Sequence, residues 1–429
     1  MSPSPSSLDP QPAIAKARRR LIPFLFLLYI VAYLDRINVG FAALQMNAAL
    51  GFSGRTFGFG AGVFFLSYVA FEIPSNIVLA RIGARVWIAR IMITWGLISS
   101  ATLLVRSAGG FYAARFALGA AEAGFLPGII FYLTRWFPAR ERGRTIAAFM
   151  AATLVAGVVG GPISGALLSL DGRAGLAGWQ WLFLLEGVPA VVLGVVVIGV
   201  LPESPMDADW LSDGERRALV QAIEDRAGEA TATDRRSVFR SGRVWRLAIV
   251  YFTIPVALYG IGFWLPQIVR AGSRGGDLTI GILSALPYVV AAVGMVAFGR
   301  HSDRTNERRL HIAVAAFVGG AAFAAAALTN GLIAELILLS IGMLGLASMF
   351  GPFWTHTTSI VGRADAAVGI ALVNSVGNIG GFVGPYVFGS IKDATNGFGA
   401  GLVFVGVVLA LGGAIASSVP DPRHRTWQC

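Results

Sequence analysis

The sequence predicts an all-α membrane protein with twelve transmembrane helices in two pseudo-symmetric halves of six. The first observation is composition, because 55% of the 429 residues are hydrophobic and only 13% are charged. A soluble domain has about 25% charged residues, so this chain has too few charges to cover a soluble globule of 45.1 kDa. The second observation is a series of twelve apolar segments. The third is the uneven placement of arginine between them.

Each apolar segment is close to the length of about 20 residues that a helix needs to cross a bilayer. We therefore expect twelve spans separated by short polar loops. The predicted spans are 21–45, 56–80, 86–105, 110–134, 145–169, 179–201, 245–269, 278–299, 310–329, 332–357, 366–391 and 398–418.

Arginine is concentrated in every second loop, and this asymmetry predicts the orientation. Lys16 and Lys392 are the only lysines, so 32 of the 34 basic side chains are arginine. Basic loops stay in the cytoplasm, which predicts that both termini are cytoplasmic. The net charge of +11 would also suit a nucleic-acid partner, but the hydrophobicity favours a lipid bilayer instead. The arginine-rich loops hold Arg18, Arg19, Arg20, Arg81, Arg85, Arg90, Arg135, Arg140, Arg142, Arg144, Arg300, Arg304, Arg308, Arg309, Arg363, Arg423 and Arg425.

The longest polar segment, 202–244, separates the sixth predicted span from the seventh. Within it, LSDGERRALVQAI predicts an amphipathic helix, with Ser212 at the N-cap and Glu215 at capping-box spacing. Residues 1–20 lack the arrangement of a signal peptide and predict a disordered tail. The expected organisation is a cytoplasmic tail 1–20, an N-terminal bundle 21–201, a cytoplasmic linker 202–244, a C-terminal bundle 245–418 and a cytoplasmic tail 419–429.

The two halves resemble each other at a constant offset. When ARIGARVW from Ala80 is superposed on DRTNERRL from Asp303, Arg81 meets Arg304 and Arg85 meets Arg308, an offset of 223 residues. The glycine-rich segments of spans 5 and 11 align Pro162 with Pro385 at the same offset. The pattern favours duplication of a six-helix unit, against a chance similarity of glycine-rich helices. Such repeats place a substrate site between the halves.

The motifs resemble those of one transporter family. GRHSDRTNERR resembles the loop signature of the major facilitator superfamily, although its first-half counterpart has Ala80 where the acidic residue would stand. YLDRINVGFAAL, RFALGAAEAGFLPGIIFYLTRWFPARERGR and FLLEGVPAVVLG are similar to the anion:cation symporter family within it. YGIGFWLPQIV, GPFWTHTTS and GIALVNSVGNIGGFVGPYVFG resemble its bacterial organic-acid branch. That branch includes tartrate-, phthalate- and hydroxyphenylacetate-type transporters.

Four charged residues are predicted deep inside the membrane, where ionisable groups usually face a cavity or a partner. Asp35 and Arg36 lie in span 1, and Arg115 and Glu122 lie in span 4. Seven residues are close to two helical turns, so Arg115 and Glu122 project from one face. An arginine can grip a substrate carboxylate through two parallel hydrogen bonds, and a carboxylate can exchange a proton as its surroundings change. The alternative is a pair of buried salt bridges that only hold helices together.

The resemblance implies a role for each of these charges. Asp35 and Glu122 match the family's protonation sites, Arg36 matches a ligand of the substrate carboxylate, and Arg115 matches a charge partner of Asp35. Tyr33 and Tyr68 match tyrosines that line the family's cavity, and Asn374 matches a substrate-binding asparagine. Thr153 and Phe353 replace a glutamine and a threonine of some sugar-acid members, which favours tartrate or an aromatic acid. The predicted binding set also includes Tyr259, Trp354 and Asn378, and Asp303, Arg304 and Arg308 are predicted to brace a gate.

Together with the resemblance, these observations predict a proton-coupled importer that carries an organic carboxylate across the bacterial inner membrane by alternating access. The alternatives are a sugar-acid symporter, or a carboxylate facilitator or exporter without proton coupling. No Walker loop or catalytic motif is present in the sequence, so we expect neither ATP drive nor enzyme activity. The proton gradient would supply the energy without any cofactor, and we expect a monomer. Glu72 and Glu186, beside prolines in spans 2 and 6, are interpreted as structural.

Overall fold

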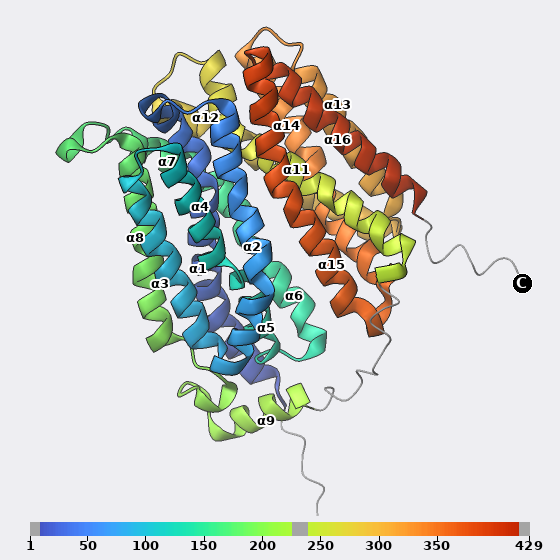
Figure 1. The fold of residues 1–429 in the computed structure, drawn as a ribbon. Helices are drawn as coiled ribbons and strands as arrows, with labels where there is room; N and C mark the ends of the chain where they lie inside the picture. Colours follow the sequence, from blue (N-terminus) through green and yellow to red (C-terminus); the bar gives the residue numbers. More distant parts are fainter. Residues whose placement is uncertain (1–8, 225–238, 420–429) are drawn as a thin grey trace, which may run out of the picture.

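The computed structural model describes residues 9–224 and 239–419, and within these ranges it contains helices and no strands (Figure 1). The first half comprises α1 (Gln11–Leu50), α2 (Gly54–Ile82), α3 (Ala84–Ala101), α4 (Ala108–Glu122), α5 (Phe125–Thr134), α6 (Ala139–Met150), α7 (Ala152–Leu168) and α8 (Gly178–Val200). The linker contains α9 (Asp213–Glu224). The second half comprises α11 (Gly242–Gly272), α12 (Asp277–Thr305), α13 (Arg309–Ala326), α14 (Leu332–Ser348), α15 (Phe350–Thr395) and α16 (Gly399–Ser418). The predicted all-α membrane architecture is confirmed.

Eleven helical stretches in the described part are long and apolar enough to cross a membrane. The fifth predicted span is formed by α6 and α7 together, which are separated only by Ala151, whose backbone angles stay helical. α15 contributes to two spans, because the Val361 side chain packs against Gly369, eight residues along the chain. In a straight helix those residues would be about 12 Å apart. Val361 and Gly369 therefore lie closer together than a straight helix allows.

The N-terminal helix begins ten residues earlier than expected. We predicted a disordered tail through residue 20, but α1 starts at Gln11, and Ala13, Ile14 and Ala17 are buried. Ion pairs hold this extension to neighbouring helices: Lys16 Nζ lies 2.6 Å from Glu215 Oε1 of α9. Glu215 also accepts a hydrogen bond from the Ser212 backbone N–H, and its own N–H donates to Ser212 Oγ. This capping box at the start of α9 positions the carboxylate that receives Lys16.

The fourth predicted span is broken in its middle. α4 ends at Glu122 and α5 starts at Phe125, because Gly124 takes a left-handed conformation (φ +88°) and Pro127 has no N–H to continue the ladder. Ser75 Oγ of α2 donates a 2.6 Å hydrogen bond to the carbonyl of Ala123 at the break. Inside a membrane such a carbonyl needs a protein partner. The break places Glu122 at a helix end within the bundle.

We expect Gly124→Ala to destabilise the protein by about 1–2 kcal/mol, since a left-handed backbone penalises any Cβ. The added methyl would also overlap the Ser75 side chain. Thermal unfolding of the detergent-solubilised protein would show a lower transition temperature. Gly109→Ala is the matched control, because open space surrounds Gly109 and its φ is not positive. Equal transitions for the two variants would show that the break does not depend on Gly124.

The two halves pack through symmetry-related glycines. A Cβ on Gly58 of α2 would overlap the Pro385 carbonyl oxygen of α15, and a Cβ on Gly161 of α7 would overlap the Gly281 carbonyl oxygen of α12. Positions 58 and 281 differ by 223, the offset found in the sequence. The α2–α15 and α7–α12 contacts therefore repeat one another. Small residues here let helix backbones approach closely without lipid between them.

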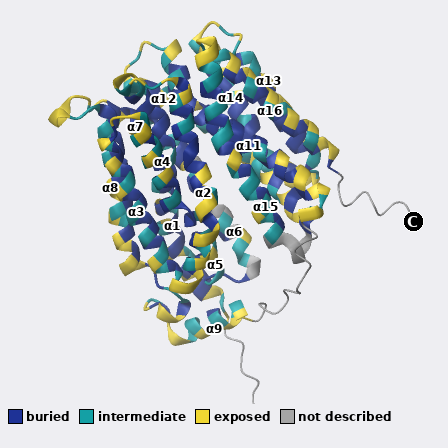
Figure 2. Cartoon of the chain, viewed as in Figure 1, coloured by how far each residue is buried: buried dark blue, intermediate teal, exposed yellow. Residues whose placement is uncertain are grey.

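The central helices of the bundle are α1 and α11, along which Figure 2 shows many buried residues. In α11, 78% of the most apolar window is buried inside the protein, compared with 33% in α8. A helix buried on all sides belongs to the centre of a bundle, whereas α8 presents most of its surface outward. The charged residues Asp35 and Arg36 lie on α1, one of these two central helices.

Among the described residues, the hydrogen bonds of 3.5 Å or less that join the two halves lie at one end of the bundle. We call the end that holds Arg85, Arg135 and Arg308 the arginine-rich end, and the other the opposite end. At the opposite end, Asp393 of α15 accepts hydrogen bonds of 2.7 Å from the backbone N–H groups of both Gly54 and Arg55. Gln45 Nε2 of α1 donates to Asp277 Oδ2 of α12 at 2.7 Å. Within the described residues, no hydrogen bond or ion pair joins the halves at the arginine-rich end.

Candidate functional site

A buried ion pair joins α1 to the broken end of α4. Arg36 Nη2 pairs with Glu122 Oε1, and their side chains are 14% and 1% exposed. The Arg36 guanidinium also lies 5.4 Å from the ring centroids of both Phe64 and Tyr68 on α2. The aromatic faces stabilise the cation, while the other Glu122 oxygen, Oε2, is buried without a hydrogen-bond partner.

Asp35 points to a different side of α1 and is 1% exposed. Its Oδ1 accepts hydrogen bonds from Ser99 Oγ of α3 and from Asn38 Nδ2, the latter at 3.2 Å. Its Oδ2 is buried without a hydrogen-bond partner. Asp35 thus sits in a polar cluster inside the N-terminal half, next to but separate from the Arg36–Glu122 pair.

Arg115 is fully enclosed and makes no ion pair with Asp35 in this structure. Its Nη2 donates a long 3.5 Å hydrogen bond to the Ala61 carbonyl, and its guanidinium lies 4.9 Å from the Phe64 ring centroid. Nε and Nη1 are buried without partners. Phe64 therefore has a guanidinium from α1 and another from α4 near its ring. The role of Arg115 as a partner of Asp35 stays a prediction, and the two groups influence each other only through their electric fields.

Tyr259 of α11 brings the C-terminal half to these charges. Its hydroxyl interacts with Arg36, and its ring centroid lies 4.2 Å from that of Phe65 on α2. Other tyrosines of both halves lie around it. They are Tyr29, Tyr33, Tyr68, Tyr251 and Tyr288. The predicted Tyr33, Tyr68 and Tyr259 are thus gathered around Arg36, together with residues that the sequence did not single out.

The predicted aromatic residues of the C-terminal half form a stack on Tyr251. The Tyr251 ring lies 5.2 Å from Phe353 in parallel and 4.8 Å from Trp354 edge to face. Tyr251 also covers Gly377, which lies between Asn374 and Asn378 on α15. Both asparagines are partly exposed, and neither amide makes a hydrogen bond to the described residues. Contact of either asparagine with a substrate stays a prediction.

Thr153 of α7 lies beside Tyr29. Its hydroxyl is buried and makes no hydrogen bond within 3.5 Å among the described residues. Tyr29 in turn packs against Phe149, with ring centroids 4.7 Å apart. Contact between Thr153 and a substrate stays a prediction.

Two of the three predicted gating residues, Asp303 and Arg308, pair with each other within the C-terminal half. Arg308 Nη1 contacts Asp303 Oδ1 at 2.7 Å and Ser302 Oγ at 2.9 Å. Glu307 caps α13 by accepting from the Leu310 N–H at 2.7 Å and contacts His311 Nδ1 at 2.8 Å. Burial raises the pKa of Glu307, but these hydrogen bonds outweigh it and hold that pKa below its ordinary value. Arg304 is exposed and has no ion pair to the described part of the chain.

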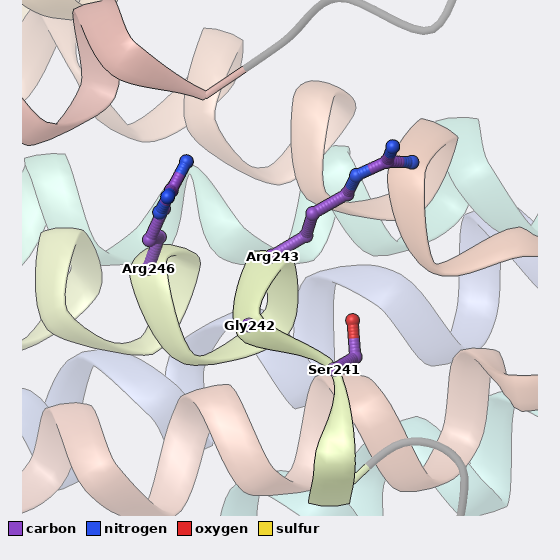
Figure 3. Close-up of a pocket in the computed structure, with 4 residues that line it drawn as sticks. All are labelled: Ser241, Gly242, Arg243 and Arg246. Atoms are coloured by element: carbon purple, nitrogen blue, oxygen red, sulfur yellow. The ribbon is translucent and has the colours of Figure 1, made fainter.

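A cavity of about 390 Å³ lies at the start of α11 and not at the buried charges. Ser241, Gly242, Arg243 and Arg246 line it, and Figure 3 shows both arginine side chains extending away from the helix on the same side. Tyr259 follows Arg243 by 16 residues, about 24 Å along α11. This cavity therefore belongs to the arginine-rich surface.

Comparison with known proteins identifies the fold and family. The profile of the Major Facilitator Superfamily matches residues 25–385. The chain belongs to this superfamily of membrane transporters. It is 47% identical, over 93% of its own length and 89% of the relative's, to a putative tartrate transporter of Agrobacterium vitis. It is 39% identical, over 92% and 91%, to a quinolone resistance transporter of Acinetobacter baumannii.

The superfamily fold is also seen in a solved structure. A crystal structure of a bacterial homologue of the human lysosomal transporter Spinster, inward-facing and unoccupied, matches with a TM-score of 0.80 at 19% identity. The match covers 94% of this chain and 96% of that one. A major facilitator protein of this size is a transporter and not an enzyme, which agrees with the prediction from the sequence.

Several residues of the site were missed by sequence reasoning. Asn38 carried a usable signal, because it follows Asp35 by three residues and so shares its helix face. Phe64 and Ser99 carried none: each is an ordinary residue of an apolar span, and only helix packing shows that it faces a buried charge.

Proposed function

We propose that this transporter imports a small organic carboxylate together with protons, across the bacterial inner membrane, with its arginine-rich end in the cytoplasm. The observation that carries the proposal is the buried Arg36–Glu122 pair. A substrate carboxylate needs the same guanidinium donors that Glu122 occupies. Binding of the anion therefore requires that Glu122 withdraw.

Protonation of Glu122 is the step that releases Arg36. A neutral carboxyl is a much weaker partner for a guanidinium than a carboxylate is. The buried surroundings of Glu122 also disfavour a carboxylate charge that no cation balances. The proton and the anion thus favour each other's binding at one place. Loss of the proton to the cytoplasm restores the ion pair and expels the substrate, and this exchange couples the two fluxes.

The predicted binding residues support a small carboxylate as the substrate. Tyr259 and its neighbouring tyrosines supply hydroxyls near Arg36. Asn374 and Asn378 are partly exposed amides, and Trp354, packed on Tyr251, is a partly exposed aromatic side chain. Tartrate fits the polar groups, and an aromatic acid fits the stack. The relative named as a putative tartrate transporter supports the first. A thermal-shift screen against tartrate, benzoate and sugar acids would rank these classes.

We expect Glu122→Gln to uncouple transport, because the amide keeps the shape of the side chain but cannot exchange a proton. In proteoliposomes, counterflow of labelled tartrate or benzoate should persist, while uptake driven by an imposed pH gradient should fall roughly tenfold or more, as expected when a carboxyl essential for proton transfer is removed. Glu335→Gln, on the partly exposed start of α14, is the control. Wild-type uptake that ignores the pH gradient would contradict proton coupling.

Export is the second candidate, and it is favoured by the relative named as a quinolone resistance transporter. The same binding group would then load from the cytoplasm and exchange protons in the opposite order. Sided proteoliposomes distinguish the two: an importer accumulates the acid when the outer bath is acidic, whereas an exporter expels it from inside under that gradient.

A further inference from the structure

Glu186 of α8 is a second deeply buried acid beside the site, and the proposed function leaves it unused. Glu186 is only 5% exposed. Ser164 Oγ of α7 donates a 2.9 Å hydrogen bond to Glu186 Oε1. The other oxygen, Oε2, is buried and has no hydrogen-bond partner within 3.5 Å among the residues described.

Asn38 stands between Glu186 and Asp35. Its amide nitrogen donates to Asp35 Oδ1 at 3.2 Å, and both the Asn38 amide and the Asp35 carboxyl lie near enough to Glu186 to act on its charge. The Ser99 hydroxyl donates a hydrogen bond to Asp35, and the Ser164 hydroxyl donates one to Glu186. Four helices, α3, α1, α8 and α7, thus enclose one polar group of two carboxyls, one amide and two hydroxyls.

This group has fewer free donors than acceptors, because one Asn38 N–H is the side-chain donor that remains for three acceptor atoms. Three acceptor atoms are buried without a partner: Asp35 Oδ2, Asn38 Oδ1 and Glu186 Oε2. Leaving a buried acceptor unpaired is unfavourable, and it is more unfavourable for a charged oxygen. A proton on one carboxyl turns an acceptor into a donor and can satisfy a neighbouring oxygen. Protonation of one carboxyl therefore helps to complete the hydrogen bonding of this group.

Neighbouring cations do not neutralise the two acids. Neither carboxyl has an ion pair with a described residue, and the adjacent Arg36 is occupied by Glu122. Arg115 of α4 acts on Asp35 from beyond ion-pair distance. Of the other helices packed against α8, α7 has no ionisable side chain, and α3 has only Arg85 and Arg90. Arg90 precedes Ser99 by nine residues, about 14 Å along the helix.

We propose that Glu186 is a proton-binding residue that forms one shared site with Asp35 through Asn38. Two carboxylates close together in an apolar interior resist ionising together, so the pair retains a proton when isolated carboxylates in water would have lost theirs. This assigns a function to a residue that the sequence analysis interpreted as structural. The role of the retained proton in coupling rests on the proposed symport, but its presence does not.

Infrared spectroscopy of the purified full-length protein without substrate tests the site directly. A protonated buried carboxyl has a C=O stretch distinct from that of a carboxylate, and we expect wild type to show this band at neutral pH. Glu186→Gln should remove or shift the band and its pH titration, and Glu335→Gln should leave both unchanged. Ser164→Ala, which keeps the acid but removes its donor, should shift the band frequency. An identical band and titration in wild type and Glu186→Gln would overturn the proposal.

Transport measurements separate this proposal from the proposed function. If wild type takes up the acid in response to a pH gradient, Glu186→Gln should move the pH at which uptake is half-maximal, whereas Glu335→Gln should not. A pH profile that Glu186→Gln leaves unchanged would overturn the coupling role of Glu186. If wild type shows no proton-driven uptake, the proposed function fails, and the infrared result still decides whether Glu186 binds a proton.

Discussion

Arg36→Lys is expected to weaken binding of the organic acid roughly ten- to a hundredfold, which corresponds to about 1.4–2.8 kcal/mol. Lysine keeps the charge but replaces a planar fork of donors with a compact ammonium, so it cannot form two parallel bonds to one carboxylate. It also loses the guanidinium faces that pack against Phe64 and Tyr68. Isothermal titration with tartrate or benzoate measures the change.

Arg36→Ala should have a larger effect, because it leaves Glu122 buried without a cation. Removing one partner of a buried pair costs about 3–5 kcal/mol, so this variant should also unfold at a lower temperature. Arg106→Lys is the matched control, since Arg106 is exposed and makes no contact with the buried charges. Wild-type affinity in Arg36→Lys would show that the substrate carboxylate binds elsewhere.

The second large effect is expected at the contact between the halves. A methyl group on Gly58 would overlap the carbonyl oxygen of Pro385, so Gly58→Ala must push α2 away from α15 at the opposite end. Overpacking of this kind costs about 1–3 kcal/mol, which lowers the population closed at that end roughly 5- to 150-fold. Spin labels at Arg173 and Thr395, in a Cys429→Ser background, should report more of the longer distances, and transport should slow.

The repeat supplies an internal check on this prediction. Gly281 is the counterpart of Gly58 at the offset of 223, and a Cβ there would overlap the Gly161 carbonyl. Gly281→Ala should therefore also separate the halves at the opposite end, by pushing α12 away from α7. Gly109→Ala is the control, because nothing lies near that position. Unchanged distances in both Gly58→Ala and Gly281→Ala would contradict a gate built on these close contacts.

The architecture was accessible from the sequence because each of its signals is local. An apolar stretch of 20 residues crosses a bilayer whatever it packs against, and a capping box such as Ser212 with Glu215 needs only a spacing of three residues. The buried charges were also accessible, since Asp35, Arg36, Arg115 and Glu122 stand out in an apolar chain. The early start of α1 could not be predicted from the sequence. Its residues Lys16 and Arg18 form ion pairs with Glu215 and Glu141, which are distant in the chain.

By itself, the sequence determined the helical class, the two related halves and which few charges need an explanation. Only the tertiary structure decided their partners: Glu122 meets Arg36, Asp35 meets Ser99 and Asn38, and Arg115 lies over Phe64. It also placed Glu186 beside Asp35. The reason is that a buried charge is costly in any apolar segment and so is visible in one dimension. Its partner is chosen by helix rotation and packing, which bring together residues as far as 151 positions apart in the chain.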